Sequence, residues 1–110
     1  MTIEQINEMV EEIGLPFDYY AFPEGTAQDP PYITWFLGEE DDFHADDSNY
    51  CDIETLNIEL YTSDKDFELE ASVEGVLRNH ELSFHKESEK IDSEKLWQTS
   101  WEMEVIINES

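Results

Sequence analysis

Basic residues are scarce in this chain of 110 residues, which has five Lys and Arg against 29 Asp and Glu. No Lys or Arg precedes Lys65, and the formal net charge is −24 at pH 7. Proteins that bind nucleic acid or anionic membrane surfaces do so by placing Lys and Arg against phosphates. The composition therefore excludes direct nucleic-acid binding and recruitment to an anionic membrane.

Cysteine, glycine and long apolar runs are also limited. The single cysteine, Cys51, excludes an internal disulfide and cannot form a thiolate zinc site by itself. The four glycines, at positions 14, 25, 38 and 75, form no phosphate-binding loop. No apolar stretch reaches the roughly 18 residues of a membrane span, and the N-terminus has no signal-peptide pattern. We expect a soluble protein that is intracellular when it is made.

Apolar residues are nevertheless present at 39%, with fourteen aromatics, and they recur periodically. Periodic placement predicts a folded chain in spite of the net charge, because disordered segments have few aromatics. A chain of this length is the size of one ordinary domain. We therefore expect a single domain over residues 1–110.

Two segments have the apolar spacing of helices. Residues 2–13 form an amphipathic pattern in which Thr2 and Gln5 match a capping box and Gly14 ends the helix. Residues 63–80 form the second pattern, with Ser63, Asp64 or Asp66 available as N-cap. Gly75 lies inside this second helix, which predicts a close approach to the sheet. The apolar stripe of the second helix contains Leu69, Val73, Val76, Leu77 and His80.

Five segments have the composition or alternation of strands: residues 15–22, 32–37, 52–62, 81–88 and 95–107. In the last of them one face is predicted to contain Trp97, Thr99, Trp101, Met103, Val105 and Ile107. The order is α-β-β-β-α-β-β. It predicts an α+β fold, with two helices on one face of a mostly antiparallel sheet of about five strands.

The stretch GEEDDFHADD, residues 38–47, contains six carboxylates and one histidine in ten positions. An EF-hand loop requires Gly at its sixth position and Glu at its twelfth, and neither Asp41 nor Asp42 as first position satisfies this. A looser calcium site and a solvated acidic loop remain as alternatives. We predict no metal site, and a partner-contact loop formed by Asp41, Asp42, Phe43, His44, Asp46 and Asp47.

Catalytic patterns are absent from the sequence. His44, His80 and His85 have no second ligand at metal-binding spacing, and no serine lies in a nucleophile elbow. Cys51 lies beside Asp52, which disfavours a thiolate. We therefore predict neither an enzyme nor a cofactor. His80 is expected near the end of the second helix, where the helix dipole favours positive charge.

Four stretches carry a resemblance to a known family: LPFDYYAFPEG, PPYITWFL, FHADDSNYCDIETLNIELYTSDKD with VEGVL after it, and IDSEKLWQTSWEMEV. In order and spacing they resemble a family of small proteins from tailed phages and prophages of Gram-positive bacteria. These proteins are encoded among head-completion and tail genes. The resemblance covers most of the chain after residue 14.

The resemblance implies a structural or assembly protein of the virion, present in the host cytoplasm during assembly and similar to tail-terminator and tail-to-head joining proteins. Such subunits close into a ring, typically of six, that contacts the tail tube and the head connector. The family has no catalytic motif to transfer. The charge supports a different hypothesis, an acidic DNA mimic that inhibits a nucleic-acid-binding host enzyme. A calcium-dependent module is the third.

Overall fold

The computed structural model describes residues 1–22, 28–38 and 53–107. Along the chain its elements are α1 (Ile3–Glu11), β1 (Phe17–Tyr19), β2 (Tyr32–Leu37), β3 (Ile53–Thr62), α2 (Phe67–Asn79), β4 (His85–Ile91) and β5 (Leu96–Ile106). The predicted α-β-β-β-α-β-β order and the α+β class are confirmed.

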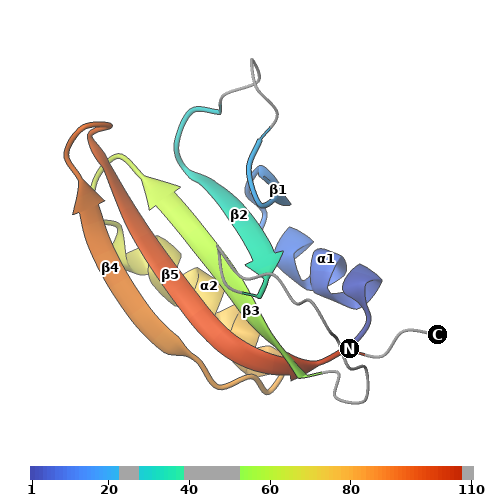
Figure 1. The fold of residues 1–110 in the computed structure, drawn as a ribbon. Coiled ribbons are helices and arrows are strands. Elements are labelled where there is room, and N and C mark those ends of the chain that lie inside the picture. The colour runs from blue at the N-terminus through green and yellow to red at the C-terminus, as the bar shows by residue number, and fades with distance from the viewer. Residues whose placement is uncertain (23–27, 39–52, 108–110) are drawn as a thin grey trace.

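The five strands form one sheet in the spatial order β1-β2-β3-β5-β4 (Figure 1). β2, β3, β5 and β4 pair antiparallel, whereas β1 pairs parallel to β2. The sheet is therefore mixed, with antiparallel pairs in the majority. A parallel pair requires the chain to return to the same end of the sheet, and the twelve residues between β1 and β2 provide that length.

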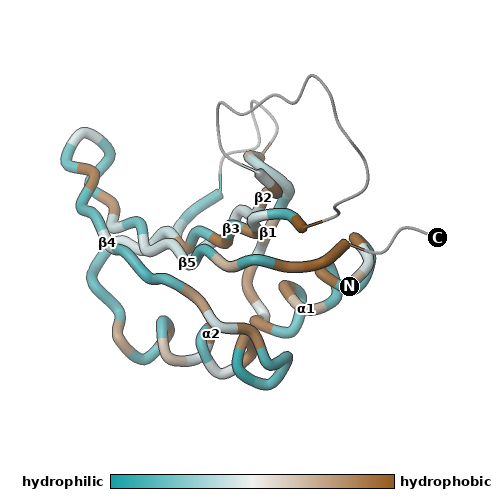
Figure 2. Tube along the Cα trace, turned by 60° about the horizontal axis from the view of Figure 1, so that its bottom comes forward, coloured by the Kyte–Doolittle hydropathy of each residue, from teal (hydrophilic) through white to brown (hydrophobic). Residues whose placement is uncertain are grey.

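Both helices lie on the same face of the sheet, as predicted (Figures 1 and 2). Their apolar sides and the facing sides of the strands enclose one core cluster. Alternation along β3 and β5 produces this arrangement, because every second side chain of a strand points to the helices. The core residues are Ile6, Met9, Val10, Ile33, Trp35, Leu56, Ile58, Leu60, Val73, Leu77, Trp101, Met103, Val105 and Ile107.

The start of α1 has the predicted capping box. Thr2 Oγ1 accepts a hydrogen bond from Gln5 N at 3.1 Å, and Gln5 Oε1 accepts one from Thr2 N at 2.9 Å. Two of the backbone donors that every helix leaves unpaired are satisfied in this way. Gly14 follows the helix with a φ of +88°, a conformation that glycine adopts without strain.

α2 begins at Phe67, and of the three predicted N-caps Asp66 is the one that forms: its Oδ1 accepts a hydrogen bond from Leu69 N at 3.0 Å. The C-cap is His80, which confirms the prediction that this histidine lies near the end of the helix. The prediction that Gly75 marks close packing against the sheet is wrong. A Cβ at this position would have nothing within 4 Å.

The bounds of β1 and β4 also differ from the sequence prediction, and β4 ends at Ile91 instead of residue 88. β1 has three residues instead of eight, because Tyr20 turns to a φ of +67° and ends the extended run. β4 starts at His85 rather than at residue 81, because Glu81 at φ +61° and the bond from Leu82 N to Leu77 O belong to the end of α2. The spacing of apolar residues does not predict these turn conformations.

Candidate interaction surface

Both helices of the described residues lie on one face of the sheet, and we call the opposite face the helix-free face. Cross-strand register places on it every second residue of the four longer strands. Its members are Tyr32, Thr34 and Phe36 of β2, Ile53, Thr55, Asn57, Glu59 and Tyr61 of β3, Leu96, Gln98, Ser100, Glu102, Glu104 and Ile106 of β5, and His85, Glu87, Glu89 and Ile91 of β4.

The helix-free face is acidic without compensation by Lys or Arg. Its five glutamates come from three adjacent strands, and no strand position of this face in the described residues holds a Lys or Arg. The bases of β4, Lys86 and Lys90, alternate to the opposite side, where they face Trp101 and Trp97. Carboxylates of this kind attract cationic partners and repel phosphates.

On the helix side, a buried carboxylate holds two of the five bases. Glu70 of α2 is 2% exposed, and its Oε2 lies 2.6 Å from Nζ of Lys65. Lys86 Nζ lies 3.0 Å from Oε1 of Glu70, and Thr99 Oγ1 donates to Oε2 at 3.2 Å. Burial alone raises the pKa of Glu70, but hydrogen bonds and positive charge from Lys65 and Lys86 outweigh it and lower that pKa.

Glu74 lies one turn further along α2 and continues the same network. Its Oε2 lies 2.8 Å from Nζ of Lys86 and accepts a hydrogen bond from Trp101 Nε1 at 3.1 Å. Burial raises the pKa of Glu74, and the bonds from Lys86 and Trp101 lower it further than burial raises it. Conversely, the hydrogen bond to Glu74 raises the pKa of Lys86. The network joins α2, β4 and β5.

This ion-pair network was not predicted from the amino-acid sequence. The signal was present, because Glu70, Val73 and Leu77 follow at i, i+3 and i+7 and therefore share the buried side of α2. Only the pairing of β4 with β5 shows which base compensates the carboxylate, since Lys86 lies sixteen positions away in sequence.

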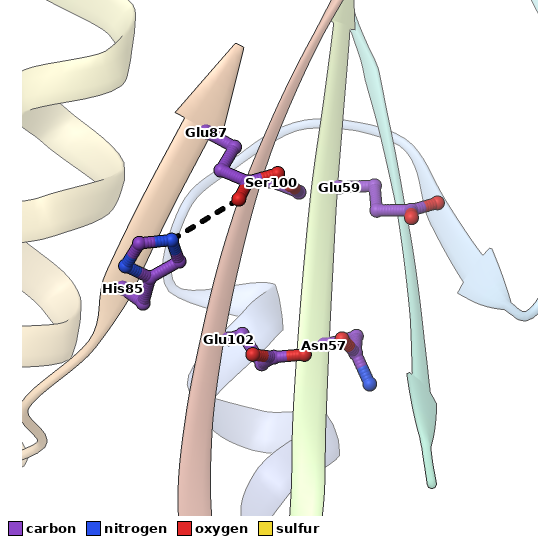
Figure 3. A pocket seen from close by; sticks show the side chains of 6 residues that line it. All are labelled: Asn57, Glu59, His85, Glu87, Ser100 and Glu102. Atoms are coloured by element: carbon purple, nitrogen blue, oxygen red, sulfur yellow. Dashed lines mark hydrogen bonds and ion pairs between the residues drawn. The ribbon is translucent and has the colours of Figure 1, made fainter. Parts of the chain in front are cut away.

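A shallow hollow of about 90 Å³ lies on the helix-free face. Figure 3 shows the six side chains that line it, which come from β3, β4 and β5. Small-molecule sites occupy about 300–1,000 Å³ and are mostly apolar, so this hollow does not have the dimensions of a substrate pocket. Its lining is Asn57, Glu59, His85, Glu87, Ser100 and Glu102.

The hollow contains the residue types of a catalytic triad but not the geometry of one. His85 Nε2 lies 3.1 Å from Glu87 Oε2, yet these side chains are 69% and 71% exposed. In the part of the chain that the structure describes, no hydrogen bond joins His85 to Ser100. An activated serine requires that hydrogen bond and a sheltered oxyanion site. The hollow is therefore better described as part of a polar surface.

Aromatic side chains border the acidic surface at β2. The rings of Tyr32 and Tyr61 are stacked with centroids 4.8 Å apart. The hydroxyl of Tyr61 donates to Glu59 Oε1 at 3.0 Å and accepts from Gln98 Nε2 at 2.8 Å. Burial and, after it, the negative charge of Glu59 raise the pKa of Tyr61. Tyr61 thus connects the aromatic and acidic parts of the face.

The predicted partner-contact loop lies outside the described residues. This applies to Asp41, Asp42, Phe43, His44, Asp46 and Asp47. Of the other histidines, His80 lies 3.1 Å from Glu12 Oε2, and His85 lies in β4 as expected. Within residues 1–22, 28–38 and 53–107, no three His, Cys, Asp or Glu side chains gather in a way that would hold a metal ion.

Comparisons with protein-family models, with curated proteins and with solved structures found no match for this chain. None of the helices in the described ranges is long and apolar enough to cross a membrane.

Proposed function

We propose that this protein is a non-enzymatic assembly subunit of a tailed phage or prophage, which closes into a ring on the tail tube as a tail-terminator or head-tail joining component. The observation that carries the proposal is the one-sided charge of the sheet, with five glutamates on the helix-free face and the bases of β4 on the other side. The sequence resemblance described above supports the same class.

A ring subunit needs two different contact surfaces and an inner surface that tolerates what passes through the ring. If the helix-free face lines the channel, its carboxylates repel the phosphates of passing DNA, and the DNA does not adhere. The partners in this proposal are further copies of the chain, six in a ring of the type that the resemblance implies, the tail tube protein and head connector proteins. No cofactor enters the proposal.

The experiment is a mass measurement in solution at high protein concentration, with and without purified tail tubes. We expect ring-sized assemblies when tubes are present. Electron microscopy should show a cap at one end of each tube. A structure of the ring with these glutamates on its outside would contradict the channel placement. Failure to cap tubes or to form rings under any of these conditions would contradict the assembly role.

The same acidic surface favours a second candidate, a DNA mimic that occupies the nucleic-acid site of a basic host enzyme. In that case the carboxylates imitate phosphates. A persistent monomer that ignores tail tubes and displaces DNA from a basic DNA-handling enzyme would favour this candidate over the ring subunit. Displacement that persists after Glu102 and Glu104 are replaced by Gln would argue against mimicry by this face.

A further inference from the structure

The two edges of the sheet differ in whether another strand can be added to them. At β1, Pro16 O and Tyr20 N bond to β2, so strand alternation directs the backbone groups of Tyr19 away from the sheet. Both of these groups are already satisfied locally. Tyr19 N donates to Asp18 Oδ1 at 2.8 Å, and Tyr19 O accepts from Ala21 N at 2.7 Å. At Tyr19 the outer edge of β1 therefore offers no free backbone group, and the strand is only three residues long.

β4 forms the other edge and has seven residues. Across the described ranges, its backbone hydrogen bonds go to β5, apart from the turn bond that Ile91 O accepts from Glu94 N. All of its side chains except that of Ile91 are exposed, and Figure 2 shows hydrophilic colours along it. An unpaired strand edge offers a row of donors and acceptors to an added strand.

Side chains on the helix side hold this edge in place. Lys86 Nζ lies between Glu70 and Glu74 of α2, at 3.0 and 2.8 Å. Ser88 Oγ lies 3.1 Å from Thr99 Oγ1 and accepts from Lys65 Nζ at 2.9 Å. An edge that is fixed before binding loses less conformational entropy when a strand is added. The buried ion-pair network therefore preorganises β4.

The charges on β4 disfavour pairing with a second copy. Two β4 strands joined antiparallel about a two-fold axis at Ser88 would place Glu87 opposite Glu89 and Lys86 opposite Lys90. An axis at Glu87 or Glu89 would place that glutamate opposite itself. Like charges directly opposite each other destabilise a strand pair. The other edge, β1, is only three residues long and has the backbone groups of Tyr19 already bonded, so it offers a second copy little to pair with.

We propose that the outer edge of β4 is a binding site for an extended segment of a different protein, which adds a sixth strand and places Lys or Arg at alternate positions beside Glu87 and Glu89. Those two glutamates lie on the helix-free face, where no strand position in the described residues holds a Lys or Arg; the neighbour of Glu87 there is His85, with Nε2 3.1 Å from Glu87 Oε2. This inference does not depend on ring formation. It concerns a strand edge, whereas the proposed channel concerns a face.

The test uses the full chain and a nine-residue peptide of alternating Lys and Thr. When this peptide binds, we expect amide exchange to slow by about tenfold or more at alternate residues of β4. We also expect the peptide to bind the wild type about tenfold more tightly than the E87K/E89K variant. A peptide of alternating Glu and Thr should show the reverse preference. The E8K/E11K variant of α1, which carries the same change in net charge, should bind the Lys peptide like the wild type.

A peptide of alternating Lys and Pro separates strand addition from simple charge attraction, because it keeps every Lys and has no backbone N–H at the positions between them, which disrupts the pairing of a strand. We expect it to bind at least about tenfold more weakly than the Lys and Thr peptide. Equal binding of the two peptides, or protection outside β4, would overturn the proposal. So would an equal loss of binding in the E8K/E11K variant.

Discussion

Lys65 Nζ lies 2.6 Å from Oε2 of Glu70, and the Glu70 side chain is only 3% exposed. In a chain with net charge −24, this pair places one of five bases against a carboxylate that lies between α2 and β5. A buried carboxylate requires such a partner, because removal from water without compensation costs several kcal/mol. The pair therefore makes stability depend on the ionisation of one residue.

We expect the E70Q substitution to lower the free energy of unfolding by about 2 kcal/mol at pH 7, the loss typical of hydrogen bonds to charged groups. The folded-state pKa of Glu70 is lowered, so its contribution is present above the unfolded pKa and is lost as pH falls through the folded pKa. The difference between E70Q and wild type should therefore shrink below about pH 4. Urea unfolding of both proteins at several pH values measures this difference in the free energy of unfolding.

The control for this substitution is E68Q, which changes an exposed glutamate of the same helix. Exposed substitutions usually change stability by less than about 0.5 kcal/mol. A loss in E70Q that matches the E68Q value, or one that stays constant from pH 7 to pH 3, would contradict the role given to the ion pair.

Substitution of two glycines by alanine should have opposite effects. Gly75 lies within α2 with open space around it, so G75A should stabilise the protein by up to about 1 kcal/mol through helix propensity. Gly14 has a φ of +88°, so G14A should destabilise it by about 1 kcal/mol. Melting temperatures that shift in the same direction for both variants would contradict this pair of predictions.

Salt should stabilise the folded protein. Repulsion among the carboxylates opposes the compact state, and raising the ionic strength from low to physiological values shortens the screening length from about 30 Å to about 8 Å. Buried pairs such as Lys65 and Glu70 are screened less. We expect the melting temperature to rise with NaCl over this range. A flat or falling melting temperature would mean that an ion or partner already neutralises the surface.

Tyr61 should make stability fall at high pH. Its folded-state pKa is raised by burial and then by Glu59, so above about pH 10 the unfolded chain loses this proton while the folded chain keeps it. Stability is thus fully present below the unfolded pKa and declines above it. The decline between pH 10 and pH 11 should be smaller in Y61F, with Y19F, an exposed tyrosine, as control. Identical pH dependence in Y61F and wild type would disprove the linkage.

Much of the architecture was predictable because periodicity reports burial. The alternation over residues 95–107 predicted one shared face for Trp97, Thr99, Trp101, Met103, Val105 and Ile107, and all of these except the half-buried Trp97 are buried. The capping box at Thr2 was predictable for a similar reason, since it depends on two residues three positions apart. The interaction surface was harder to predict from the sequence. The predicted loop is one continuous run of carboxylates, whereas the helix-free face collects glutamates from three strands.

By itself, the sequence determined the order of elements, the alternation of side chains along the long strands, and the strongly negative net charge. These features depend on local spacing and on total charge. Tertiary structure alone decided that β1 runs parallel to β2, that Glu70 is buried against Lys65 and Lys86, and that β4 is the open edge. The physical reason is that strand direction, ion pairing and edge position depend on contacts between segments far apart in the chain.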